Sequence, residues 1–145
     1  MRFTAAACLL AGCLVLSGCG GQDFRPALGK ALDQGSTAVA SSHLALELDS
    51  AGKSTSAVTV TALENMLKEA EDAHTSVVDL SARTHQDRAL RDEALDVLAE
   101  AVAAVLGSKE TTESGASRQA LDYSLKELEH AATRLRDLKE SAGAQ

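Results

Sequence analysis

Small and apolar side chains recur along this chain at alternating steps of three and four residues. These steps match the 3.6-residue period of an α-helix, so the repeated residues share one helical face. No segment shows the strict alternation of a half-buried β-strand. The first repeat comprises Leu28, Leu32, Gly35, Val39, Ser42 and Leu46.

Three further segments repeat the pattern, and together the four segments predict an all-α protein. The second inward face comprises Val60, Leu63, Leu67, Ala70, His74 and Val77; the third Leu90, Ala94, Leu98, Ala101, Val102 and Val105; the fourth Leu121, Leu125, Leu128, Ala132 and Leu135. Joined by short polar turns, they form an antiparallel up-down four-helix bundle about 40 Å long. The alternative is a three-helix bundle with a long central helix, since neither glycine nor proline separates Ala57 from Leu106.

Capping residues predict where the helices begin and end. The first helix starts after Asp23, and the second is capped by Ser54, Thr55 or Ser56 and runs to about Thr84. Thr84 followed by Asp87 fits a capping box, which favours a break at that point. The third helix is expected from Gln86 to Leu106.

Gly107 is expected to stop the third helix. Residues 107–115 carry no apolar side chain and predict a mobile, exposed loop. The fourth helix then begins between 114 and 117. The bundle is expected to span residues 24–141, with a frayed tail at 142–145.

The N-terminal residues have the pattern of an export signal. A single cation, Arg2, precedes an uncharged stretch from Phe3 to Leu16. This stretch is shorter than the roughly 20 residues that a helix needs to cross a bilayer, which argues against a permanent transmembrane anchor.

Leu16, Ser17, Gly18 and Cys19 end this stretch, and they resemble the lipobox of bacterial lipoproteins. The resemblance implies that residues 1–18 are a signal peptide that is removed. Cys19 then becomes the N-terminus and carries a diacylglycerol on its sulfur, with acyl chains such as palmitate. Residues 19–23 are left as a lipidated N-terminus and short tether.

A second lipobox match lies at Leu10–Cys13. Cleavage there leaves an apolar core of only about nine residues, so Cys19 is favoured. Removal through residue 18 leaves a single cysteine, which excludes an intrachain disulfide. The fold must then be stabilised by apolar packing.

The charge balance limits the classes of partner. Lysine and arginine total 14 against 21 aspartates and glutamates, giving a net charge of −7 that disfavours nucleic-acid binding. An anionic membrane surface repels such a chain, so the acyl chains must supply the anchoring. The expected location is the extracytoplasmic face of the cell membrane, or the outer membrane if the host has one.

Two Glu-x-x-His sequences, at 71–74 and 127–130, resemble those of ferritin-like di-iron bundles. On a helical wheel, Glu127 and His130 lie far from the apolar face centred on Leu128, which excludes the di-iron interpretation. We therefore predict no metal, no cofactor and no catalytic residue.

His74 lies within the second apolar stripe, with Glu71 at its edge and His43 at the edge of the first stripe. The simplest interpretation is a core imidazole bonded to a neighbour such as Glu71 or Ser42. The alternative is a carrier bundle that binds a metal, a haem or a small apolar ligand near His74, with Glu71 and His43 as its other candidate residues.

Small inward residues predict either a ligand pocket or tight helix packing, and packing is favoured: Gly35, Ala70, Ala94, Ala101 and Ala132. Leu44, Leu48 and Leu80 lie off the main faces and are expected to form an exposed surface for a partner protein. The sequence thus predicts a lipid-anchored, acidic, non-enzymatic interaction or accessory module of the cell envelope.

Overall fold

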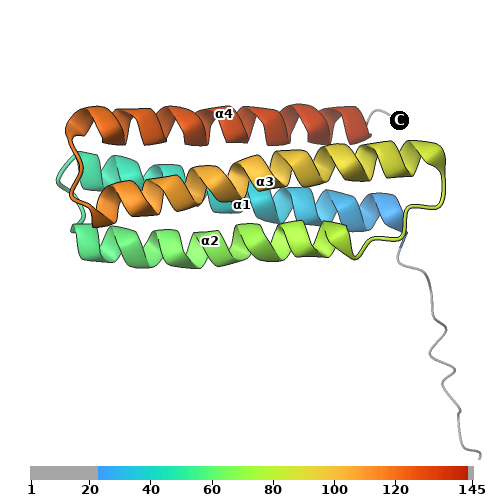
Figure 1. Ribbon diagram of the computed structural model, residues 1–145, viewed down its shortest axis with the longest axis horizontal. Coiled ribbons are helices and arrows are strands. Elements are labelled where there is room, and N and C mark those ends of the chain that lie inside the picture. Colours follow the sequence, from blue (N-terminus) through green and yellow to red (C-terminus); the bar gives the residue numbers. More distant parts are fainter. Residues whose placement is uncertain (1–22, 144–145) are drawn as a thin grey trace, which may run out of the picture.

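The computed structural model describes residues 23–143 and contains four helices in that range (Figure 1). They are α1 (Phe24–Ser50), α2 (Ser56–Val78), α3 (His85–Glu113) and α4 (Arg118–Gly143). Consecutive helices run in opposite directions, which confirms the predicted four-helix bundle. The break between α2 and α3 excludes the three-helix alternative. The predicted lipobox residues Leu16, Ser17, Gly18 and Cys19 lie outside the described residues.

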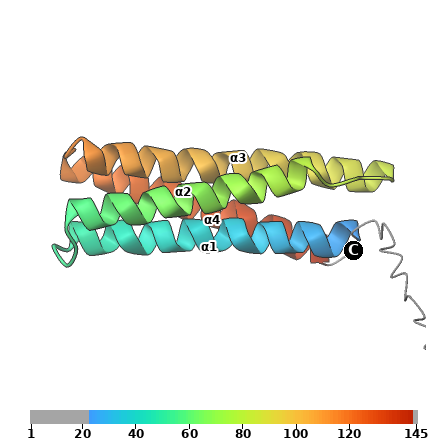
Figure 2. The same cartoon turned by 90° about the horizontal axis from the view of Figure 1, so that it is seen from below.

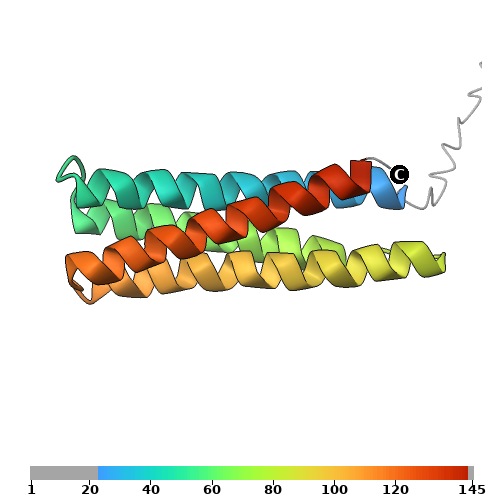
Figure 3. The same cartoon turned by 90° about the horizontal axis from the view of Figure 1, so that it is seen from above.

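The helices do not pack as a regular square. α1 contacts α2 and α4 and also reaches α3 across the diagonal, whereas no such contact joins α2 to α4 within residues 23–143. α2 runs obliquely from α1 toward α3 (Figure 2), and α4 runs obliquely from α3 toward α1 (Figure 3). The bundle is therefore flattened along the α1–α3 diagonal.

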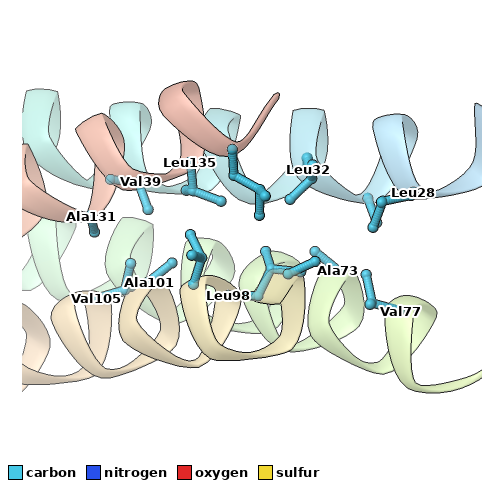
Figure 4. Close-up of a cluster of buried hydrophobic side chains, with 14 of the residues drawn as sticks. Leu28, Leu32, Val39, Ala73, Val77, Leu98, Ala101, Val105, Ala131 and Leu135 are labelled. Atoms are coloured by element: carbon cyan, nitrogen blue, oxygen red, sulfur yellow. The ribbon is translucent and has the colours of Figure 1, made fainter. Parts of the chain in front are cut away.

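Gly35 makes this close α1–α3 contact possible. Leucine, valine and alanine side chains from the four helices point into the shared core (Figure 4). A Cβ atom at Gly35 would lie 2.5 Å from Leu98 Cδ2, so the leucine occupies the space beside the glycine. Ala94 and Ala101 on α3 are also fully buried. These small residues favour tight helix packing, as predicted.

Threonines cap α2 and α3: Thr84 is the cap that the sequence predicts, and Thr55 is one of the three predicted candidates for α2. The Thr55 hydroxyl accepts a hydrogen bond from the Val58 amide at 3.4 Å. The Thr84 hydroxyl accepts one from the Asp87 amide at 3.0 Å and donates to the Asp87 carboxylate at 2.7 Å. Both bonds satisfy groups in the first helical turn that have no partner within the helix.

α2 ends earlier than predicted, at Val78 rather than near Thr84. The chain then turns so that Leu80 is only 9% exposed and packs on the core. Arg91 Nη1 on α3 donates to the Leu80 carbonyl at 3.3 Å, which holds this turn in place. The prediction that Leu80 belongs to an exposed surface is therefore wrong.

α3 continues past Gly107 to Glu113, so the predicted loop at 107–115 is also wrong. Ser108 and Thr112 are buried, and each hydroxyl donates to the carbonyl four residues earlier, on Ala104 and Ser108 respectively. Beyond Glu113 the chain turns away at Gly115, which has a φ of +60°. The Ala116 amide there bonds the Thr111 carbonyl at 3.2 Å, as in a Schellman motif.

The inward faces of α2 and α4 are rotated relative to the prediction. On α2, Ala73 is fully buried while His74 is only half-buried. On α4, Ala131 and Leu138 are buried while Leu125 and Ala132 are half-buried.

α4 extends two residues past the predicted end of the bundle, to Gly143. Arg25 Nη1 at the start of α1 donates to the Ala142 carbonyl at 3.0 Å. This bond keeps the last turn of α4 helical where a frayed tail is predicted, and it holds the two described ends of the chain together.

Candidate functional site

The three predicted ligand-site residues do not form one site. Glu71 is exposed and His74 is half-buried, because the inward face of α2 is centred on Ala73. The α1–α2 register is given by Gln34 Nε2, which donates to Glu69 Oε2 at 2.8 Å. His43 lies nine residues beyond Gln34 on α1, and His74 lies five residues beyond Glu69 on α2. Because the two helices run in opposite directions, these offsets add to about 21 Å along the bundle.

His43 lies instead at the contact between α1 and α4. Its Nδ1 is 3.6 Å from Glu47 Oε2, one turn along α1, and its Nε2 is 3.5 Å from Glu129 Oε1 on α4. Nε2 is buried and has no hydrogen-bond partner within the described part of the chain. The imidazole therefore lies between two carboxylates and connects α1 to α4.

This arrangement does not suit a metal ion. The two carboxylates approach opposite nitrogens of the ring, so the three side chains do not converge on one point. Among residues 23–143, no group of three or more histidine, cysteine, aspartate or glutamate side chains has a geometry that could hold a metal.

A groove between α3 and α4 is the second candidate site. Its lining includes Ala103, Ala104 and Gly107 from α3, and Tyr123, Glu127 and His130 from α4. His130 is exposed, as the helical wheel predicts. The groove was not predicted, because Gly107 was assigned to a helix stop. The step of three and four that continues through Val105, Ser108 and Thr112 is the signal that would have extended α3.

An ion-pair cluster joins α2 to α3 near the same end of the bundle. Lys109 Nζ lies 2.8 Å from Glu113 Oε1 and 3.8 Å from Glu64 Oε1. The hydrogen bond with Glu113 raises the pKa of Lys109, although desolvation acts in the opposite direction. The cluster stabilises the charged lysine and links α2 to α3.

Within residues 23–143, none of the helices has the length and apolar character that a membrane span requires. Comparison with protein-family models, with curated proteins and with solved structures gives no match to this chain.

Proposed function

We propose that this protein is a lipid-anchored interaction or accessory module, non-enzymatic, on the extracytoplasmic face of the cell membrane. The observation that carries the proposal is the Leu16–Cys19 sequence, which ends an apolar stretch four residues before Asp23. Asp23 immediately precedes the first helix of the bundle.

The short distance between Cys19 and α1 would orient the bundle on the membrane. Residues 19–23 span at most about 17 Å when fully extended. An anchor on Cys19 would therefore hold the end of the bundle that carries Asp23, the 79–84 loop and Ala142 against the bilayer. The sides of the helices and the loops at 51–55 and 114–117 would face away from it.

The exposed side chains support an interaction role. Leu44 is 56% exposed and Tyr123 is 64% exposed, and both lie on the sides of the bundle rather than in its core. Tyrosine is among the residue types that are enriched at protein interfaces.

Processing at Cys19 can be tested with the full chain and two cysteine variants expressed in a bacterium that has the lipoprotein pathway. We expect the wild-type chain in the membrane fraction, with an N-terminal mass equal to an acylated Cys19 peptide. Cys19→Ser should be unacylated and unprocessed, because the thiol is the acceptor. Cys13→Ser is the matched control and should behave like wild type.

Two results would contradict the anchor. One is recovery of the wild-type chain from the cytosol, starting at Met1 and without added acyl mass. The other is acylation that is lost in Cys13→Ser and kept in Cys19→Ser.

A further inference from the structure

We propose that the groove between α3 and α4 docks a basic amphipathic helix of a partner protein. The inference rests on the proposed function for its setting, an interaction module held at a membrane, and it adds the surface and the chemistry of the partner. The groove has a volume of about 460 Å³.

The floor of the groove is shaped to receive side chains. It consists of small residues, Ala103, Ala104 and Gly107 on α3 and Ala131 on α4. A Cβ atom at Gly107 would meet nothing within 4 Å, so the space above it is open. The lining runs along α3 from Glu100 to Thr111, about 17 Å or three helical turns, which suits a helix laid in the groove.

The charge around the groove favours a basic partner. Glu100 and Glu127 stand on opposite sides of the floor. Arg134 Nη2 lies 3.7 Å from Glu100 Oε1, so this arginine partly offsets the negative charge of the rim. Two further carboxylates, Glu93 and Asp96, lie on α3 beyond the lining, and α3 has no lysine or arginine between Arg91 and Lys109. Asp92 lies there too, but it pairs with Arg91 at 3.6 Å.

The same charge argues against a second copy of this chain as the occupant. The chain carries a net charge of −7, so two copies repel one another. A helix with lysine or arginine along one side instead places its cations on the rim and its small apolar side chains on the floor.

Tyr123 supplies an aromatic contact at the rim. Its side chain is 64% exposed and lies one turn from Glu127 on α4. A lysine or arginine beside Glu127 can also lie over the tyrosine ring, which adds a cation–π contact. Tyrosine is among the residues that contribute most at protein interfaces.

The test uses the full chain, purified from whichever cell fraction contains it. The probe is a synthetic helical peptide of about 18 residues with lysines along one face and alanine and leucine along the other. The control is a peptide of the same composition in scrambled order, which has the same charge but no separate lysine-bearing and apolar faces. We expect tighter binding of the amphipathic peptide by calorimetry, with amide NMR shifts concentrated at Ala103, Gly107 and Tyr123.

Gly107→Leu fills the floor from within and should fold, because its new side chain meets open space. It should weaken peptide binding by about tenfold or more, the loss expected when an anchoring pocket is filled. Gly29→Leu is the matched control, since that α1 position is equally open and lies outside the groove. Circular dichroism should show the same helix content for both variants.

Glu127→Gln should weaken binding by up to about fivefold, as expected for one exposed ion pair. Glu71→Gln, at an exposed position on α2, should leave binding unchanged.

Three outcomes would overturn the docking proposal: equal binding of the scrambled peptide, unchanged binding by Gly107→Leu, or a wild-type dimer that this substitution dissociates. None of them depends on lipidation. A chain that lacks acylation at Cys19 but binds the peptide in the groove would overturn the proposed anchor alone.

Discussion

At the scale of single residues, Gly35 shows how one missing side chain brings two helices together. The space that its Cβ would need is occupied by Leu98 Cδ2, at 2.5 Å. Any side chain at position 35 must displace that leucine, which is fully buried among its neighbours. Because cores are tightly packed, such a displacement costs free energy.

Two alanine substitutions in α1 isolate this effect. Both Gly35→Ala and Gly29→Ala gain the same helix propensity, about 1 kcal/mol, but only Gly35→Ala forces Leu98 to move. We expect Gly29→Ala to be the more stable variant by about 1–3 kcal/mol, the usual cost of overpacking. Urea unfolding followed by circular dichroism measures the difference, and equal stabilities would mean that α1 and α3 are not in close contact.

Lys109 leads to a prediction about alkaline pH. Its pKa is raised in the folded protein, so the charged form stabilises the fold fully below the unfolded-state pKa. That contribution is lost as pH rises through the folded-state pKa, which lies above the ordinary value for lysine. Thermal unfolding between pH 9 and pH 12 should show a smaller alkaline loss of stability for Lys109→Met than for wild type.

Lys68→Met is the control for this titration, because Lys68 is exposed on α2. The assignment of the alkaline stability loss to the Lys109–Glu113 contact would be wrong in two cases. One is that Lys109→Met loses as much stability at alkaline pH as wild type, and the other is that Lys68→Met reduces this loss equally.

At the scale of the elements, helix starts could be predicted from the sequence better than helix ends. Thr55 and Thr84 cap their helices through bonds to residues three positions later, which a local sequence pattern specifies. The end of α3 was missed because Gly107 resembles a stop. Its backbone is helical, and the buried Ser108 and Thr112 satisfy their own hydroxyls within the helix.

The continuity of α3 predicts opposite effects for two glycines. Gly107→Ala should stabilise the protein by about 0.5–1 kcal/mol, because the position is helical and open. Gly115→Ala should destabilise it by about 1 kcal/mol, since alanine disfavours a φ of +60°. Unfolding curves for the two variants measure both effects. Destabilisation by Gly107→Ala would mean that position 107 is not helical, as the predicted loop requires.

At the scale of the whole molecule, the sequence predicted the number and order of the helices but not their arrangement. The rotated faces of α2 and α4 and the α1–α3 contact depend on packing between distant segments, which local periodicity does not specify. The candidate site was affected in the same way. His74 and His43 were predicted individually as edge or core residues, while the carboxylate facing His43 Nε2 comes from Glu129 on another helix.

The core changes in character along the bundle. Near residues 23 and 143 the core contains leucines such as Leu28, Leu90 and Leu138, whereas toward the opposite end buried hydroxyl groups lie among leucines such as Leu46 and Leu63. Those hydroxyl-bearing residues are Ser42, Thr59, Ser108, Thr112 and Ser124. Hydroxyl groups contribute less burial free energy than leucine side chains, so the two ends should differ in local stability.

Hydrogen exchange measured by mass spectrometry should reveal this gradient. We expect faster exchange in the helical turns around Thr59 and Ser124 than in those around Leu32 and Leu135, after correction for intrinsic rates. Uniform protection along all four helices would mean that the hydroxyl-rich end is as stable as the leucine-rich end.

The bond between Arg25 and the Ala142 carbonyl indicates that the chain could be circularly permuted. Since the start of α1 and the end of α4 lie at the same end of the bundle (Figure 1), a short linker could join them while a new opening is cut at Gly52. Such a circular permutant would keep every helix contact. A lipid attached at the new opening would then invert the bundle on its membrane. The α3–α4 groove lies about 22–39 Å from the end that carries Asp23. In the permutant, the groove would lie close to the lipid headgroups.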